Sequence, residues 1–247
     1  MLIVHRFPCL SDNYGFLAHD EASGTTAAID SPDADAILTE LNRRGWTLDL
    51  ILNTHWHPDH AGGNAALQTA TGAKAYGPAE VEKIAKLDKV LVGGDEVMLG
   101  DTRLQVLDTG GHTLGHISYW DQADAIVFVG DTLFALGCGR MFEGDPDQFW
   151  TSLSRLAALP DETAVYCAHE YTASNARFAL SVDDAPAVAM RAEQIFEARN
   201  RGEPTVPTTI GAEKAANPFL RGPLLRPDLS PAMAFAAIRA AKDSFKG

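Results

Sequence analysis

The segment Thr54–His60 holds the densest group of side chains that could do chemistry, in the order Thr-His-Trp-His-Pro-Asp-His. Imidazole nitrogens and carboxylate oxygens are ligands that zinc, iron and manganese accept. In a chain of this composition the pattern HxHxDH is expected by chance only roughly 7 × 10⁻⁴ times. Its candidate ligands are His55, His57, Asp59 and His60. These are too many for one catalytic metal that keeps a position open for water, so the segment favours two metal ions.

Three more candidate ligands, His112, Asp131 and His169, follow apolar runs that predict strands. Strand ends in α/β folds present side chains to a common crevice, where the first segment is also expected. Any one of these residues would more often be a turn or buried polar residue, but together they extend the ligand set. Asp131 has a further use, because the two oxygens of a carboxylate can bridge two cations. Asp30 and His116 are expected to support the ligands rather than to bind metal.

The residues up to position 170 alternate between predicted strands and predicted helices. Apolar runs bounded by turn residues predict strands at Leu2–Phe7, Tyr14–His19, Thr25–Asp30, Leu48–Asn53, Glu96–Leu99, Arg103–Asp108, Ile117–Trp120, Ala125–Val129 and Ala164–Ala168. Helical spacing predicts helices at Ala34–Arg44, His60–Thr71, Pro78–Leu87 and Gln148–Leu159. Later helices are expected at Ala185–Asn200, Thr209–Ala215 and Pro231–Phe245, with no strand after residue 170. We therefore expect an α/β body at residues 1–170 and a small helical domain at residues 171–247.

The composition is that of a folded globular protein, since 46% of the 247 residues are hydrophobic and 21% are charged. The formal net charge of −13 argues against nucleic acid as a partner, because nucleic-acid binding needs a basic face. The charge is uneven: residues 171–247 carry 10 basic and 8 acidic side chains, and the rest of the chain is strongly acidic. This mildly basic segment is either chance drift in composition or a surface that meets an anionic ligand.

The three cysteines, Cys9, Cys138 and Cys167, form no CxxC pair and predict neither a disulfide framework nor a cysteine-type zinc site. No run approaches the 18 apolar residues of a membrane-spanning helix. The first residues become polar too soon for a secretory signal. We therefore expect a cytoplasmic protein with no membrane partner.

The ligand pattern resembles the metallo-β-lactamase superfamily, in which HxHxDH is followed by a distant His, Asp and His. Within that superfamily the chain is similar to the glyoxalase II (hydroxyacylglutathione hydrolase) family. The more specific matches are Asp12–Tyr14, Gly110–His116, Gly130–Phe134, Gly137–Arg140, His169–Thr172 and Asn217–Arg221. They span residues 12–221, and the last three surround the family's glutathione site.

The resemblance implies a four-layered αβ/βα sandwich with a small C-terminal helical domain. It also implies two divalent metal ions per chain, with zinc expected first and iron or manganese as alternatives. One metal would be held by His55, His57 and His112, the other by Asp59, His60 and His169, with Asp131 as the bridge. Glutathione contacts would map to Arg140, Tyr171 and Arg221. Two departures concern that contact set: Phe142 stands where the family often has Tyr, and Gly-Pro-Leu-Leu-Arg follows Arg221 where some members have a Lys close behind.

These expectations combine into a dinuclear metal thioesterase that cleaves S-D-lactoylglutathione, and other 2-hydroxyacyl thioesters, into glutathione and a hydroxy acid. Asp59 is expected to help orient the nucleophile, and Asp131 to hold both cations. The expected partner is this small glutathione thioester, and the expected assembly is a monomer.

Three alternatives remain open at this stage. The first is a glutathione-persulfide dioxygenase with one iron, which would use two histidines and one carboxylate on the same scaffold. The second is a non-catalytic protein that binds metal or glutathione, and the third is a nuclease, which fits poorly with the negative net charge. The absence of GxSxG, GxGxxG and GxxxxGK[ST] motifs disfavours serine-hydrolase, dinucleotide and P-loop chemistry.

Overall fold

The computed structural model describes residues 1–247, and its backbone divides into two compact units. The first unit consists of Met1–Asp108 and Gly115–Gly130, and the second of Thr109–Leu114 and Asp131–Gly247. The boundary expected near residue 170 lies inside the second unit, because the residues from Asp131 onward pack with the C-terminal helices. The HxHxDH segment belongs to the first unit, whereas His112, Asp131 and His169 belong to the second.

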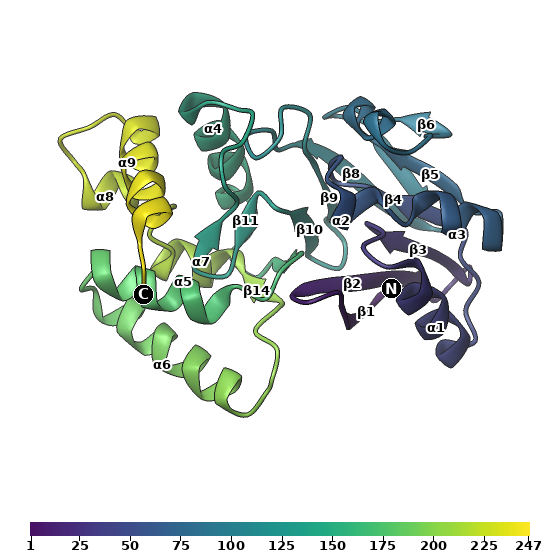
Figure 1. Ribbon diagram of the computed structural model, residues 1–247, viewed down its shortest axis with the longest axis horizontal. Helices are drawn as coiled ribbons and strands as arrows, with labels where there is room; N and C mark the ends of the chain where they lie inside the picture. Colours follow the sequence, from purple (N-terminus) through teal and green to yellow (C-terminus); the bar gives the residue numbers. More distant parts are fainter. The chain divides into compact units, whose positions relative to one another are not determined.

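The first unit contains a six-stranded sheet whose strands follow the order of the chain (Figure 1). The strands are β1 (Leu2–Cys9), β2 (Asn13–Asp20), β3 (Thr25–Ile29), β4 (Leu50–Leu52), β5 (Lys74–Gly77) and β6 (Lys89–Val90). Strands β1 to β3 pair antiparallel, and β3 to β6 pair parallel. Parallel neighbours require a crossover connection, and α1 (Ala34–Arg44) lies in the first of them. This arrangement makes the loop after β4, which carries the HxHxDH segment, a strand-end loop.

The remaining strands of the first unit form an antiparallel meander of β7 (Glu96–Leu99), β8 (Thr102–Asp108), β9 (Ile117–Asp121) and β10 (Ile126–Gly130). Side chains from the two sets of strands meet in the core, where the rings of Phe16 on β2 and Phe128 on β10 lie 6.1 Å apart. On the other face of the six-stranded sheet, Ile37 and Leu41 of α1 pack in one cluster with Leu17 of β2. The first sheet is therefore buried on both faces.

Local chemistry explains where α1 begins and ends. The Asp33 side chain caps the helix by accepting hydrogen bonds from the backbone nitrogens of Asp35 and Ala36. Gly45 ends it in the left-handed conformation, with φ of 68°. The predicted helix Ala34–Arg44 is thus confirmed with the same bounds.

Two predicted helices differ from the structure. The continuous helix predicted at His60–Thr71 is wrong, because α2 (Pro58–Ala61) and α3 (Asn64–Thr71) are separate. The chain breaks at Gly63, whose backbone nitrogen donates to the carbonyl of Ser31 instead of continuing a helix. The helix predicted at Pro78–Leu87 is only a short 3₁₀ turn, η1 (Ala79–Lys83).

The second unit is mainly helical. Its elements are β11 (Leu133–Phe134), β12 (Gly137–Cys138), α4 (Pro146–Ala157), β13 (Ala164–Cys167), α5 (Thr172–Val182), α6 (Pro186–Asn200), β14 (Thr208–Thr209), α7 (Ile210–Ala216), α8 (Gly222–Leu225) and α9 (Pro231–Ser244). Helices α5 and α6 run side by side (Figure 1). Helix α4 packs on α9, with the rings of Phe149 and Phe235 5.2 Å apart. The expectation of no strand after residue 170 is wrong, because β14 pairs with β13.

Two other findings bear on the earlier expectations. The cysteines Cys9, Cys138 and Cys167 are all buried and free, which agrees with a packing role. No helix of the structure has both the length and the apolar character needed to cross a membrane.

Candidate metal centre and substrate cavity

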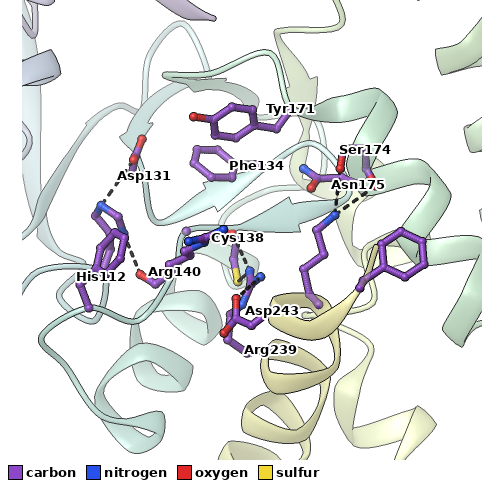
Figure 2. A pocket seen from close by; sticks show the side chains of 14 residues that line it. His112, Asp131, Phe134, Cys138, Arg140, Tyr171, Ser174, Asn175, Arg239 and Asp243 are labelled. Carbon is purple, nitrogen blue, oxygen red and sulfur yellow. Dashed lines mark hydrogen bonds and ion pairs between the residues drawn. The ribbon is translucent and has the colours of Figure 1, made fainter. Parts of the chain in front are cut away.

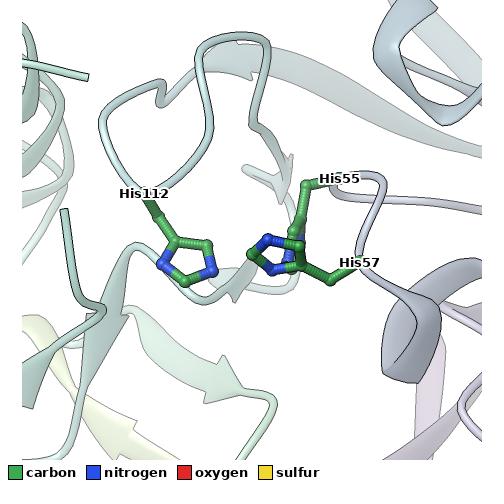
Figure 3. Close-up of side chains that lie close together, drawn as sticks. All are labelled: His55, His57 and His112. Atoms are coloured by element: carbon green, nitrogen blue, oxygen red, sulfur yellow. The ribbon is translucent and has the colours of Figure 1, made fainter. Parts of the chain in front are cut away.

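His55 and His57 lie on the same loop after β4, and their rings meet edge to face with centres 4.7 Å apart (Figure 3). Nε2 of His55 lies 3.0 Å from Nδ1 of His57. Pro58 opens α2 immediately afterwards and starts a short turn that carries Asp59 and His60. Because Nε2 of His55 and Nδ1 of His57 lie so close together, the loop directs two candidate ligand nitrogens to the same place.

The buried carboxylate of Asp30 orients two of the candidate ligands. One oxygen, Oδ2, lies 2.8 Å from Nδ1 of His60 and 2.9 Å from the hydroxyl of Thr54. The Thr54 hydroxyl donates to Asp30, so its lone pair accepts from Nδ1 of His55 at 3.0 Å. Both histidines therefore carry their proton on Nδ1 and leave Nε2 to act as a ligand, which is the usual arrangement around metal-binding histidines. The supporting role expected for Asp30 has this physical basis.

Asp59 is held by Asn13, the first residue of β2. The side-chain amide of Asn13 donates to Oδ2 of Asp59 at 3.1 Å and to its backbone carbonyl at 3.3 Å. The same carboxylate oxygen lies 3.6 Å from Nε2 of His60. Asp59 is the one carboxylate of the segment, and its side chain is 38% exposed.

In the second unit Asp131 lies between two histidines. Oδ2 of Asp131 is 3.4 Å from Nε2 of His112, and Oδ1 is 3.3 Å from Nε2 of His169. All three side chains are buried. Each carboxylate oxygen thus faces a different imidazole, which is the geometry expected of a carboxylate that bridges two cations.

The loop Gly137–Arg140 fixes the orientation of His112. Because the backbone carbonyl of Arg140 can only accept, Nδ1 of His112 donates to it at 2.7 Å and Nε2 is left as the ligand nitrogen. Gly139 makes this approach possible, since a Cβ there would lie 2.0 Å from the carbonyl oxygen of Asp131 and 2.9 Å from Nδ1 of His112. A side chain at position 139 would push the two candidate ligands apart.

The donor set fits divalent metal ions. Imidazoles that are protonated on Nδ1 present Nε2, and Asp59 and Asp131 supply carboxylate oxygens, which is the mixed nitrogen and oxygen chemistry of catalytic zinc, iron and manganese sites. The structure accordingly contains groups of histidine and aspartate side chains that could hold a metal ion.

A cavity of about 540 Å³ opens beside His112 and Asp131 in the second unit (Figure 2). This volume is typical of small-molecule sites. The cavity is lined by His112, Asp131, Phe134, Cys138, Gly139, Arg140, Phe142, Tyr171, Ser174, Asn175, Arg239, Lys242, Asp243 and Phe245. It therefore joins two candidate metal ligands to a group of basic and aromatic side chains.

The basic groups come from two separate parts of the chain. Arg140 lies on the loop after β12, whereas Arg239 and Lys242 project from α9. Arg239 is fixed, because it donates to the carbonyl of Cys138 at 3.0 Å and to Asp243 at 2.9 Å. Lys242 donates to the hydroxyl and the carbonyl of Ser174, both at 3.1 Å. Burial, together with Arg239, Arg177 and Arg140, lowers the pKa of Lys242 to about 8.

The three predicted glutathione contacts are placed differently from one another. Arg140 and Tyr171 line the cavity, and the Tyr171 ring stacks on His169 with ring centres 4.7 Å apart. Arg221 is not among the lining residues, and its Nε donates to the buried carboxylate of Asp183 at 2.6 Å. Phe142, which departs from the family pattern, is exposed at the cavity edge.

Sequence reasoning missed Arg239 and Lys242. The signal available for them was the excess of basic residues after position 170, but that excess does not say which of them face a cavity. Helix α9 is rich in alanine, so its apolar pattern gives no sharp prediction of its buried face.

Comparison with known proteins first defines the class. The model of the metallo-beta-lactamase superfamily matches residues 22–169, and the model described as "Hydroxyacylglutathione hydrolase C-terminus" matches residues 170–245. A protein named hydroxyacylglutathione hydrolase from Erythrobacter litoralis is 56% identical over 99% of this chain and 100% of its own length.

Solved structures agree with this class. The crystal structure of ETHE1 from Myxococcus xanthus superposes with a TM-score of 0.72 at 30% identity, covering 96% of this chain and 90% of that one. The structure of TTHA1623 in a di-iron-bound form gives a TM-score of 0.64 at 26% identity, covering 88% of this chain and all of that one. The protein has the mixed α/β metallo-β-lactamase fold with a C-terminal helical region. The chain belongs to the hydroxyacylglutathione hydrolase family of that superfamily.

We expect Asp30→Asn to weaken zinc binding by about 10- to 100-fold, because an amide nitrogen cannot accept the protons that Asp30 receives. Competition with a chromophoric chelator measures this affinity. Asp33→Asn is the matched control, since asparagine also caps helices well and α1 should be unaffected. Equal zinc affinity in Asp30→Asn and the wild type would contradict the orienting role of Asp30.

Arg221→Ala should lower the free energy of unfolding by about 3–5 kcal/mol, because it leaves the Asp183 carboxylate buried without its charged partner. Chemical denaturation at constant pH measures the change. Arg226→Ala removes an arginine of an exposed ion pair from the same segment and should cost no more than about 0.5 kcal/mol. A similar small loss in both variants would show that the Arg221–Asp183 pair is not structural.

Proposed function

We propose that the protein hydrolyses S-(2-hydroxyacyl)glutathione thioesters, such as S-D-lactoylglutathione, to glutathione and a 2-hydroxy acid. The observation that carries this proposal is the cavity in which three basic side chains stand beside the candidate metal ligands His112 and Asp131. Glutathione carries carboxylates at both ends of the tripeptide, and its thioester is uncharged. A cavity whose basic side chains can bind these carboxylates, and whose candidate metal ligands lie beside them, suits such a molecule. The name of the relative that is 56% identical points to the same reaction.

We further propose that the chain holds two divalent metal ions. His55, His57 and His112 would hold one, Asp59, His60 and His169 the other, and Asp131 would bridge them. Zinc is the first choice for such a donor set, and iron or manganese would also be accepted. Bound divalent metals lower the pKa of water towards neutrality and polarise a carbonyl oxygen, which is the chemistry that thioester hydrolysis requires.

The chain's own residues have separable tasks. Asp30 and the carbonyl of Arg140 hold the ligand histidines in one tautomer. Asp131 places negative charge between the two imidazoles that face it, and so lowers the repulsion between two cations. Asp59, which is held by Asn13, would orient the nucleophile by accepting a hydrogen bond from it. The departing thiolate of glutathione is a stable anion, so no strong general acid is needed.

The tripeptide would bind in the cavity of the second unit. Arg140 and Lys242 present cations to the carboxylates, and Tyr171 forms an aromatic wall beside His169. Arg239 is tied to Asp243 and Cys138, so it shapes the cavity and adds positive potential. Residues 171–247 thus supply three of these four side chains, Tyr171, Arg239 and Lys242, and residues 1–170 supply all seven proposed ligands. The free cysteines are compatible with a reducing compartment, and we place the reaction in the cytoplasm.

The direct test is hydrolysis of S-D-lactoylglutathione, followed at the C–S absorbance, with metal analysis of the same sample. We expect two metal ions per chain in a fully active preparation. Asp131→Ala should lose metal and at least about 10- to 100-fold in rate, because the bridge is removed. Full activity with one metal per chain would exclude the dinuclear site. Oxygen consumption with glutathione persulfide, without thioester hydrolysis, would instead identify a dioxygenase.

The pKa of Lys242 gives a pH test of the glutathione site. A lysine with a pKa of about 8 is charged at pH 7 and largely neutral at pH 9, so a carboxylate held by its charge is released as pH rises. We expect the KM for the glutathione thioester to increase about tenfold between pH 7 and pH 9 if only the charged form binds. Lys242→Met should raise KM at pH 7 and abolish this dependence.

Two controls isolate the effect of Lys242. A small thioester without the tripeptide reports titrations at the metal centre, and its KM should not follow the same curve. Arg226→Ala should keep both the wild-type KM and its pH dependence, because Arg226 lies in an exposed ion pair outside the cavity lining. An unchanged pH profile in Lys242→Met would remove Lys242 from the substrate site.

A further inference from the structure

The hairpin of β11 and β12 lies between Asp131 and Arg140 in the sequence and forms part of the cavity wall. Its turn is Ala135–Leu136, and Leu136 has a positive φ of 54° although it is not glycine. Backbone of this kind costs energy in an L-residue and persists only when the surroundings hold it. Leu136 is completely buried, so the contacts that hold it are within the protein.

Side chains from outside the hairpin form hydrogen bonds with the backbone N–H and C=O groups of this turn. Oε2 of Glu213, on α7, accepts from the backbone nitrogen of Leu136 at 2.8 Å. The amide of Asn217 donates to the carbonyls of Phe134 and Gly137 at 3.1 and 2.9 Å. Asn175, on α5, donates to the carbonyl of Ala135 at 3.1 Å. Four consecutive residues of the hairpin, 134 to 137, are thereby held by three side chains.

Glu213 is the centre of this network. It is fully buried, and each of its hydrogen-bond partners is a donor: Leu136, Asn217 at 2.9 Å and Thr208 at 2.7 Å. Glu213 therefore acts as a hydrogen-bond acceptor for the Leu136 backbone and the Asn217 amide. Burial raises the pKa of Glu213, while these hydrogen bonds and the charge of Arg191 oppose that rise. The network therefore places a buried hydrogen-bond acceptor under the turn.

The hairpin is coupled to the candidate ligands by close backbone packing. Gly139 follows β12 directly and leaves no space for a Cβ between the carbonyl of Asp131 and the ring of His112. The next carbonyl, that of Arg140, receives the Nδ1 proton of His112. A shift of the hairpin would therefore move the Asp131 backbone and the acceptor of His112 together.

We propose that Glu213 and Asn217 are positioning residues, which hold the β11–β12 hairpin so that Asp131 and His112 meet in metal-binding geometry and Arg140 faces the cavity. Neither residue lines the cavity or belongs to the candidate ligand set, so both act through the hairpin backbone. The inference rests on the proposed metal centre, but its first readout does not require the proposed reaction.

The test compares Glu213→Ala, Glu213→Gln and the wild type in zinc affinity, measured by chelator competition well below the unfolding temperature. Glu213→Ala should bind zinc at least about 10-fold more weakly, as expected when a group that orients ligands is lost. Glu213→Gln should recover most of the affinity, because its carbonyl can accept from Leu136 and its amide can donate to the Thr208 hydroxyl. Glu203→Ala removes an exposed glutamate and should match the wild type.

The outcomes separate positioning from general stability. A folded Glu213→Ala protein with a lower unfolding temperature but unchanged zinc affinity would overturn the proposal. If Glu213→Ala does not fold, Asn217→Ala is measured in its place, and it should show the same loss of zinc affinity. With the glutathione thioester, Glu213→Ala should also lower kcat and raise KM. Failure of the wild type to hydrolyse that thioester would reject the proposed function and leave the zinc comparison as the test of positioning.

Discussion

The rest of the structure depends on one constraint: a metal-binding imidazole must present a chosen nitrogen, so its other nitrogen needs an oxygen acceptor. Asp30 meets this need for His60 directly and for His55 through the Thr54 hydroxyl. In the second unit a backbone carbonyl, that of Arg140, meets it for His112. Much of the surrounding polar structure holds these acceptors still. Their burial strengthens the hydrogen bonds and keeps water from competing for them.

The candidate ligands could be picked out from the sequence because their chemistry is concentrated in short segments at strand ends. The histidines at positions 55, 57 and 60 belong to one local pattern. The apolar strand before it indicates that this pattern lies in a loop at a strand end. The α/β body, the helix Ala34–Arg44 and the helical C-terminal region followed from the same local signals, whereas the layered sandwich was implied by the family resemblance. Strands of two residues, such as β11 and β14, could not be predicted, because two residues show no alternation.

The substrate site was less predictable, because its charged residues differ only in tertiary placement. Arg221 and Lys242 are both cationic side chains of the C-terminal region, and both can bind a carboxylate. In the structure Arg221 pairs with the carboxylate of Asp183, which lies 38 positions earlier in the chain. Lys242 instead lines the cavity and donates to Ser174. The Nε of Arg221 is engaged by a buried acid, which ties this guanidinium to a place outside the cavity lining. Composition alone could not distinguish these two situations.

Glu213 illustrates why a buried carboxyl group is retained at such a site. Burying a carboxyl group costs free energy unless its hydrogen bonds are made, so stability alone does not explain why Glu213 is completely enclosed. An apolar residue at position 213 could fill the space, but it would leave the Leu136 nitrogen and the Asn217 amide without their acceptor. The turn at Leu136 would then lose the contact that favours its left-handed backbone. The carboxylate thus specifies one conformation of the hairpin, and that conformation is the one in which Asp131 stands between His112 and His169.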